Sequence, residues 1–150
     1  MGLFDSLFGK KKMTLEEADK KNDAFIAKNP IAKNDENEMM RNASKLMTSG
    51  KYSESIDLYK KLSDDFPQNK GLYESQIGAA YYFLGDYDNA IKYYVSGMNN
   101  GGDKRMMDDN IWEATEALYN KTKDKSKLEQ YITLFPNGSY KKKAEKLLQN

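Results

Sequence analysis

A ten-residue stretch of this chain, GKYSESIDLY at residues 50–59, returns 35 residues later as GDYDNAIKYY at residues 85–94. Gly, Tyr, Ile and Tyr occupy the same positions in both copies. A period of this size is typical of proteins built from stacked, similar units rather than of a globular enzyme fold. Because one unit cannot bury its apolar face alone, the copies stack and leave a shared surface for a partner. The sequence therefore predicts a repeat architecture and an interaction function, without identifying the partner or its pathway.

The residues around the first copy predict a helical hairpin, because apolar residues recur before Gly50 at the three- and four-residue steps of a buried helix stripe. They are Met39, Ala43, Leu46 and Met47. Gly50 ends this helix, since glycine accepts the left-handed conformation of a C-terminal cap. Ser53 is the expected N-cap of the next helix, and Pro67 stops that helix. The buried stripe of the second helix comprises Ile56, Tyr59 and Leu62.

The second copy lies in a hairpin of the same design. Gly78 is small enough to let a neighbouring helix approach closely, Gly85 turns the chain, and the breaker cluster NNGG at 99–102 ends the second helix. The apolar positions of its first helix are Leu72, Ile77, Tyr81 and Leu84, and those of its second helix are Ala90, Ile91, Tyr94 and Val95.

These residues resemble the tetratricopeptide repeat, whose consensus is W-x2-L-G-x2-Y, then A-x3-F, then P. The second copy matches through Ile77-Gly78-x2-Tyr81 and Ala90-x3-Tyr94, and the first through Ser55-x3-Tyr59 followed by Pro67. A third copy is degenerate. It keeps the consensus spacing at Trp112 and Tyr119, but Phe135-Pro136 arrives about one turn early, so its second helix should be short. The resemblance covers roughly residues 36–149.

The resemblance implies an all-α fold, with tetratricopeptide-type helical hairpins stacked in a right-handed superhelix (an α-α solenoid) and a C-terminal capping helix that Ser139 begins. We expect helices near 37–49, 53–65, 71–84, 88–99, 105–122, 125–134 and 139–149. Three parts follow: a short amphipathic segment (1–12), an extra helix and linker (13–35), and the repeat domain (36–150). The residues expected to be largely buried are Tyr59, Ile77, Tyr81, Ile91, Tyr94, Trp112 and Tyr119.

Composition excludes most catalytic chemistry. The chain has no cysteine and no histidine, so disulfides, thiolate nucleophiles, Cys/His metal sites and histidine general bases are absent. We expect no metal and no cofactor. The competing class is a carboxylate enzyme, for which Asp64-Asp65 and Asp108-Asp109 are the nearest candidates. Both pairs sit at expected helix ends, where acids commonly cap or solvate, and adjacent residues point to different sides of a helix. We therefore predict a non-enzyme.

The charge pattern predicts a protein partner rather than a nucleic acid. The 24 basic and 23 acidic residues alternate, giving a formal net charge of +1, whereas a nucleic-acid binder usually has a one-sided basic surface. No apolar run approaches the ~20 residues of a transmembrane helix. The first residues also lack the pattern of a secretory signal, so we expect a cytoplasmic protein.

The resemblance also implies where a partner binds, because the first helix of each repeat in this family lines a concave groove. The positions carried over as partner-binding residues are Met40, Ser44, Met47, Leu72, Ser75, Gln76, Ala79, Tyr82 and Phe83. Further groove positions are Asn37 and Thr48 in the first repeat, and Asn110, Glu113, Ala117 and Asn120 in the third. Such a mixture suits a peptide or helix held by apolar contacts and a few hydrogen bonds.

One known use of the family is not expected here. Chaperone-binding members hold a C-terminal carboxylate with Lys and Asn on the first repeat, Asn on the second, and Lys and Arg on the third. Met40 and Ser44 occupy the first pair of positions, and Gln76 lies near the Asn position of the second repeat. The carboxylate clamp is therefore missing, and we predict a different peptide or protein partner, with an adapter or scaffold role.

The N-terminal segment leaves two interpretations open. Its apolar stripe and the lysines after it are Leu3, Phe4, Leu7, Phe8, Lys10, Lys11 and Lys12. This stripe either packs on the repeats or contacts a membrane surface as an interfacial anchor, which would make the protein peripheral to the membrane. The start Met1-Gly2-x3-Ser6 also fits a myristoylation pattern. So short a helix buries little apolar area, so we expect a weak and reversible attachment. Next, Thr14 and Glu17 form an expected capping box for a helix to about residue 28.

Overall fold

The computed structural model describes residue 20 and residues 34–150, and within these residues the chain is helical, with no strand. The helices are α3 (Asn34–Thr48), α4 (Tyr52–Asp65), α5 (Lys70–Phe83), α6 (Tyr87–Asn99), α7 (Lys104–Thr122), α8 (Ser126–Leu134) and α9 (Lys141–Gln149), with a short 3-10 turn η1 (Pro67–Asn69) before α5. Each of the seven helices expected from the sequence is present, with bounds that differ by at most three residues. The expected all-α class is thereby confirmed for this part of the chain.

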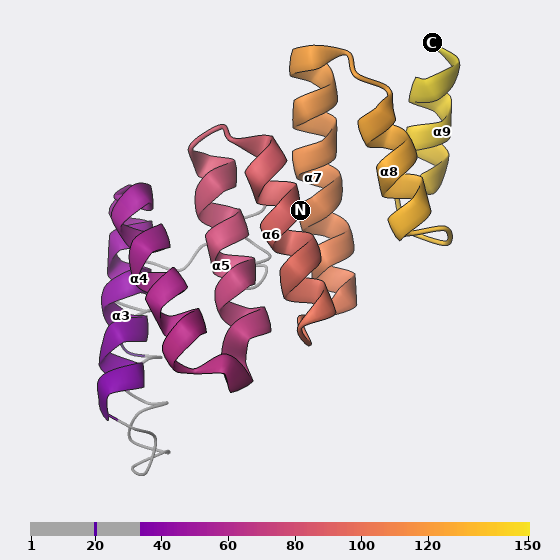
Figure 1. Cartoon of the computed structure of the whole chain (residues 1–150). Helices are drawn as coiled ribbons and strands as arrows, with labels where there is room; N and C mark the ends of the chain where they lie inside the picture. Colours follow the sequence, from indigo (N-terminus) through magenta and orange to yellow (C-terminus); the bar gives the residue numbers. More distant parts are fainter. Residues whose placement is uncertain (1–19, 21–33) are drawn as a thin grey trace.

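The helices form a row in which each packs against the next along the chain, from α3 to α9 (Figure 1). Alternate helices are also connected. The side chain of Glu36 on α3 accepts hydrogen bonds from Tyr73 on α5 and from Asn69, and Ser75 on α5 contacts the sulfur of Met107 on α7 at 3.6 Å. The first helices of the hairpins, α3, α5 and α7, therefore line one side of the row.

The two copied sequence stretches form the same turn. Gly50 and Gly85 have φ angles of 76° and 78°, in the left-handed region that favours glycine. In each turn the glycine N–H donates to the carbonyl three residues back, at 3.1 and 2.9 Å, and the next N–H donates five residues back, at 2.9 and 3.0 Å. This bonding pattern is a Schellman-type C-cap. The turn between the helices of each hairpin was thus correctly predicted.

Two predicted N-caps are wrong. Ser53 lies inside α4, which starts at Tyr52 after a Lys51 that makes no side-chain cap, and Ser139 lies before α9, which starts at Lys141. The caps that do form use aspartate. Asp86 accepts a hydrogen bond from the backbone N–H of Asn89 at 3.2 Å, and Asp103 accepts one from Met106 at 2.8 Å. Asp and Ser stabilise a helix N-terminus to a similar extent. Residue type alone therefore does not show which candidate side chain caps a helix.

The core contains the repeated residues in matching roles. Tyr59 and Tyr94, which end the two copied stretches, are 5% and 0% exposed, and Gly78 leaves room for the Tyr94 ring. The seven residues expected to be largely buried are buried except Tyr81, which is only partly buried, as are Met39, Leu46 and Val95 of the predicted stripes. Leu72 and Leu84 were placed on a buried stripe, but they are 51% and 48% exposed. Leu72 lies between the buried Gly71 and Tyr73, so it is on the side of α5 that the neighbouring helices leave open, and Leu84 follows the end of α5.

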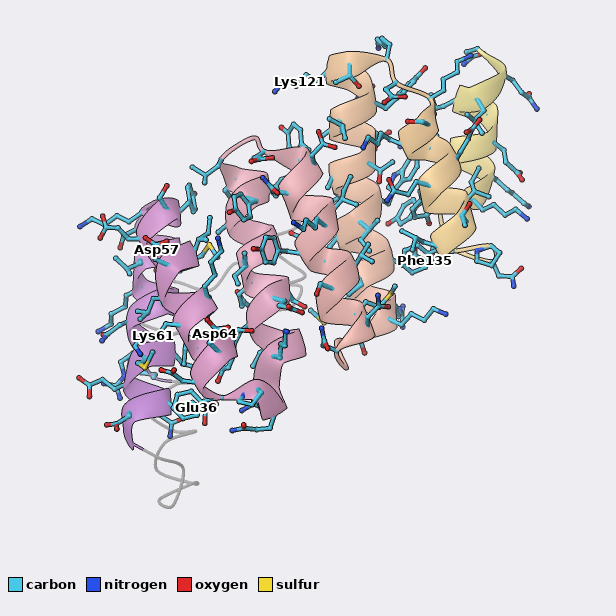
Figure 2. All side chains as sticks on the ribbon, in the orientation of Figure 1. Glu36, Asp57, Lys61, Asp64, Lys121 and Phe135 are labelled. Atoms are coloured by element: carbon cyan, nitrogen blue, oxygen red, sulfur yellow. The ribbon has the colours of Figure 1, made fainter. Side chains whose placement is uncertain are left out.

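The last hairpin is closed by aromatic side chains. Trp112 on α7 stacks on Tyr140 with ring centroids 5.4 Å apart, and it meets the edge of Tyr131 on α8 at 5.0 Å. Phe135 lies against Tyr131 at the end of α8 (Figure 2). Helix α8 has only nine residues, as the early Phe135-Pro136 predicted. Helix α9 then covers this end of the row, and its Ala144 is fully buried.

Candidate interaction face

The side of the row lined by α3, α5 and α7 carries the helices on which the sequence predicts the partner-binding residues, and we call it the α3–α5–α7 face. Burial raises the pKa of Tyr82 on α5, and the nearby carboxylates of Glu113 and Glu116 on α7 raise it further. The opposite side is lined by second helices. There Lys60 of α4 lies over the rings of Tyr81 and Tyr93 at 5.8 and 5.7 Å.

The nine predicted binding residues divide by exposure. Met47 and Ala79 are 3% and 0% exposed, and Ser75 is 8% exposed and donates to the Gly71 carbonyl at 2.7 Å. These three side chains belong to the core, so they lie out of reach of a partner at the surface. Leu72 is exposed. The remaining five are partly buried: Met40, Ser44, Gln76, Tyr82 and Phe83.

Four aromatic rings form a connected cluster at the turn end of the first two hairpins. Phe83 stacks on Tyr52 of α4 at 5.3 Å and meets the edge of Tyr82 at 5.9 Å, and Tyr82 contacts Tyr87 of α6 at 5.3 Å. All four rings are partly exposed. We call this set, Tyr52, Tyr82, Phe83 and Tyr87, the ring cluster. The sequence analysis missed Tyr52 and Tyr87 as site residues, although both are the third residue of a copied stretch.

Three buried polar atoms have no hydrogen-bond partner within the described part of the chain. They are Nδ2 of Asn37, the hydroxyl of Tyr94 and Oδ1 of Asn110, in residues that are 5%, 0% and 1% exposed. Burial raises the pKa of Tyr94, and the nearby Glu113 and Tyr82 raise it further. Unpaired buried polar groups are uncommon and costly. Asn37 and Asn110 are among the further groove positions predicted from the sequence, but their burial places them out of reach of a partner at the surface.

Helix α9 and the residue before it engage the acidic side of α7. Lys143 pairs with Glu116 at 2.6 Å and lies 5.6 Å from the centre of the Trp112 ring. The hydroxyl of Tyr140 donates to Asp109 at 2.9 Å. Asp109, Glu113 and Glu116 follow one another at the spacing of a single helix face, so this part of the α3–α5–α7 face is acidic.

Three of the four candidate catalytic carboxylates are engaged by other groups of the chain: Asp65, Asp108 and Asp109. Asp108 is 8% exposed and accepts hydrogen bonds from the Tyr131 hydroxyl and from the backbone N–H of Ser139, which fastens α7 to α8 and to the segment before α9. The expectation that Asp108 caps or solvates a helix end is therefore wrong. Asp64 and Asp65 are exposed at the end of α4, where Asp65 pairs with Lys61 at 2.7 Å (Figure 2).

The hollows on this part of the chain are shallow and of mixed chemistry. One of about 350 Å³ lies between the start of α7 and the turn after α8, and another of about 330 Å³ lies between the α5–α6 turn and the end of α7, near Lys121 (Figure 2). Within the described residues, no group of three or more acidic residues is arranged to hold a metal ion. The site is therefore described best as an open face rather than a pocket.

The predicted membrane-contact residues, 3–4, 7–8 and 10–12, and the predicted capping box at 14–17 lie outside the described residues. Among the helices that the structure does describe, none has the length and apolar character needed to span a bilayer. Comparison with known protein families found no family model that matches this sequence, and a search of curated proteins found no similar one.

Proposed function

We propose that this chain is a non-enzymatic protein-interaction module of tetratricopeptide type, an adapter or scaffold that holds a peptide or a helix of another protein on its α3–α5–α7 face. Two features support the family assignment. The copied stretches form turns with the same hydrogen bonds, and the helices pack in chain order as stacked hairpins do. A right-handed superhelix with a concave groove is part of this proposal.

The observation that carries the proposal is the ring cluster. Rings that are partly exposed and already packed on one another offer a large apolar area at a low cost in side-chain entropy, which is why aromatic residues dominate binding hot spots. Met40, Ser44 and Gln76 extend this area along α3 and α5 with apolar and hydrogen-bonding groups. An amphipathic helix or an extended peptide has the matching chemistry.

The test is affinity capture from the native cell extract, with proteins identified by mass spectrometry. The wild-type chain is compared with a Met40→Glu/Tyr82→Glu variant. Two carboxylates added to the face, one of them beside Glu113 and Glu116, should repel an apolar or acidic ligand and abolish capture of the specific partner. A milder variant, Gln76→Arg, should weaken capture without altering the core, because the Gln76 side chain is only partly buried.

A matched control adds two carboxylates elsewhere, at the exposed Gln130 and Thr133 of α8 (Gln130→Glu/Thr133→Glu). Thermal unfolding of each variant reports whether the fold is retained. A partner that is lost in the face variants and kept in the control supports the proposal. Equal capture by all folded variants would show that the α3–α5–α7 face is not the binding surface.

The alternative of a peripheral membrane scaffold rests on the N-terminal sequence, and it is tested separately. An anchored chain should sediment with anionic liposomes, and added salt should weaken this binding by screening the lysines. Phe4→Glu/Phe8→Glu should then abolish sedimentation and leave the thermal stability almost unchanged. Absence of lipid binding in the wild-type chain would remove this alternative for the unacylated protein.

A further inference from the structure

We infer that the chain's own N-terminal segment, residues 1–33, is a ligand of the α3–α5–α7 face, with the stripe Leu3, Phe4, Leu7 and Phe8 packed on the ring cluster, so that a partner must displace it. This inference rests on the proposed function, because it assigns a regulation to the same face. It concerns the protein alone, however, and can be tested without any partner.

The point of attachment favours this occupant. The segment joins the described chain at the start of α3, and this end of α3 is fixed beside the start of α5. The carboxylate of Glu36 accepts hydrogen bonds from Asn69, just before α5, and from the buried Tyr73 within it (Figure 2). The segment therefore begins at one end of the α3–α5–α7 face.

The segment is also long enough. Helix α5 has 14 residues and is about 21 Å long, which is the distance that a ligand must cover to reach Tyr82 and Phe83 at its far end. The predicted helix at 14–28 alone would cover about 22 Å, and five extended linker residues add about 16 Å. The stripe at residues 3–8 can thus reach the ring cluster without strain.

The chemistry of the two surfaces is complementary. Two leucines and two phenylalanines on one helix side match a face of partly exposed rings. Lys10, Lys11 and Lys12 follow the stripe directly, and the whole segment carries seven lysines against five acidic residues. Glu113 and Glu116 of α7 provide the opposite charge next to Tyr82, and Glu116 shares its charge with Lys143 of α9.

The tether compensates for the small contact area. A tether of this length holds the stripe at an effective concentration of roughly millimolar, so even a weak contact keeps the face largely occupied. The apparent association constant of a partner is then its intrinsic value multiplied by the fraction of molecules whose face is uncovered. A face that is about nine-tenths covered would bind an external ligand about tenfold more weakly than an uncovered face.

The absence of cysteine permits a direct test on the full chain. A nitroxide spin label is attached at Ser6→Cys, which lies between the two pairs of stripe residues, and the broadening of backbone amide NMR signals is measured. We expect broadening at Ser44, Gln76 and Tyr82, and none at the exposed Lys142 and Lys146 of α9, which is several helices further along the row. Phe4→Glu/Phe8→Glu in the labelled chain should remove it.

Other labelling outcomes overturn the inference. Broadening that is strongest at Lys142 and Lys146, or no broadening in residues 34–150, would show that the segment does not dock on this face. A mixture of spin-labelled chain and isotope-labelled chain without the nitroxide detects contact between molecules. Broadening that occurs only in this mixture would show that the occupant is a second copy of the chain.

A second measurement uses a synthetic peptide of residues 1–12 as the probe. It should bind the Phe4→Glu/Phe8→Glu chain, whose face is uncovered, and bind the wild-type chain about tenfold more weakly. The same peptide carrying both Glu substitutions is the control and should bind neither. Equal affinity for both chains would contradict self-occupancy. These results do not depend on capture of a cellular partner, so the two proposals can fail independently.

Discussion

The second hairpin and the last hairpin solve the same packing problem in opposite ways. Between α5 and α6 the backbones come so close that a Cβ atom on Gly71 would lie 2.4 Å from the carbonyl oxygen of Asn100. Between α7, α8 and α9 the space is filled by Trp112, Tyr131 and Tyr140. A repeat that stacks on neighbours can use small residues at its interface, whereas a terminal hairpin with neighbours on one side only needs large rings to build a core.

The buried carboxylates of the two hairpins also differ in what they connect. Glu74 of α5 is 7% exposed and accepts hydrogen bonds from Ser96 of α6 at 2.8 Å and from Asn100 at 2.9 Å, within one hairpin. Asp108 instead connects α7 with α8 and with the segment before α9. Both carboxylates therefore join residues more than 20 positions apart, but the bonds of Glu74 stay within one hairpin, whereas those of Asp108 connect α7 with two further segments.

The largest expected effect is the loss of Trp112. Trp112→Ala would leave a cavity between α7, α8 and α9 and remove the stack on Tyr140, so we expect a loss of about 3–5 kcal/mol in the free energy of unfolding. Urea denaturation followed by circular dichroism measures it. If the terminal hairpin is an independent unit, α8 and α9 should also lose amide-exchange protection before α3–α6 do. A uniform loss of protection would show that the two regions unfold together.

The next effect tests the close approach in the second hairpin. The three backbone atoms nearest to a Cβ on Gly71 all lie within 2.9 Å, so Gly71→Ala must push α6 away from α5, and we expect a loss of about 2–3 kcal/mol. Gly50→Ala is the matched control. Gly50 has a positive φ but nothing within 4 Å, so its substitution adds only backbone strain of about 1 kcal/mol. Equal losses in the two variants would refute the steric argument.

The comparison also shows what the sequence could predict. Helix ends and turns depend on residues close in the chain, so Gly50, Gly85 and the cluster at 99–102 were sufficient to locate them. The predicted core was correct where a stripe is covered on both sides, as at Ile77 and Ile91. The predictions for Leu72 and Leu84 were wrong because periodicity does not reveal which side of a helix its neighbours cover.

The site residues were harder to predict for the same reason. Register alone placed Met47 and Ala79 on a binding surface, but their exposure depends on how closely α4 and α6 pack on α3 and α5. Asp108 had no local signal of its role, because its partners Tyr131 and Ser139 are 23 and 31 residues away. Tyr52 and Tyr87 could have been identified from the sequence, because both occupy the third position of the copied stretches. That shared position was used only to predict the fold.

A smaller effect concerns alkaline pH. Burial and the carboxylate of Asp109 raise the pKa of Tyr140 from 10.0 to about 12, so folding favours the neutral phenol. Its contribution to stability is complete below pH 10 and is lost as the pH rises through about 12. Tyr140→Phe keeps the ring on Trp112 and removes the hydroxyl, so its stability should fall less steeply above pH 10 than that of the wild type.

Denaturant titrations at a series of alkaline pH values measure this slope, and phenolate absorbance reports the ionisation itself. Burial also raises the pKa of Tyr59 in the first hairpin, which has no carboxylate among the causes of its shift. Tyr59→Phe should thus change the slope without affecting the bond to Asp109. Identical slopes for the wild type and Tyr140→Phe would show that the terminal hairpin does not depend on this phenol.

The smallest effect comes from a surface ion pair, Lys143 with Glu116, which joins α9 to α7 at 2.6 Å. A double-mutant cycle with Lys143→Ala and Glu116→Ala should give a coupling of about 0.5 kcal/mol, because both side chains retain contact with solvent and the pair is screened. The Lys61–Asp65 pair of α4 is as short, at 2.7 Å, but it joins residues of one exposed helix surface and should show no measurable coupling. Lys143 also lies over the Trp112 ring, so part of its effect should persist at about 1 M salt, where the Debye length is only about 3 Å. Complete loss of the effect of Lys143→Ala at about 1 M salt would mean that the ring adds nothing, and that the terminal hairpin is held by its core and by Asp108 alone.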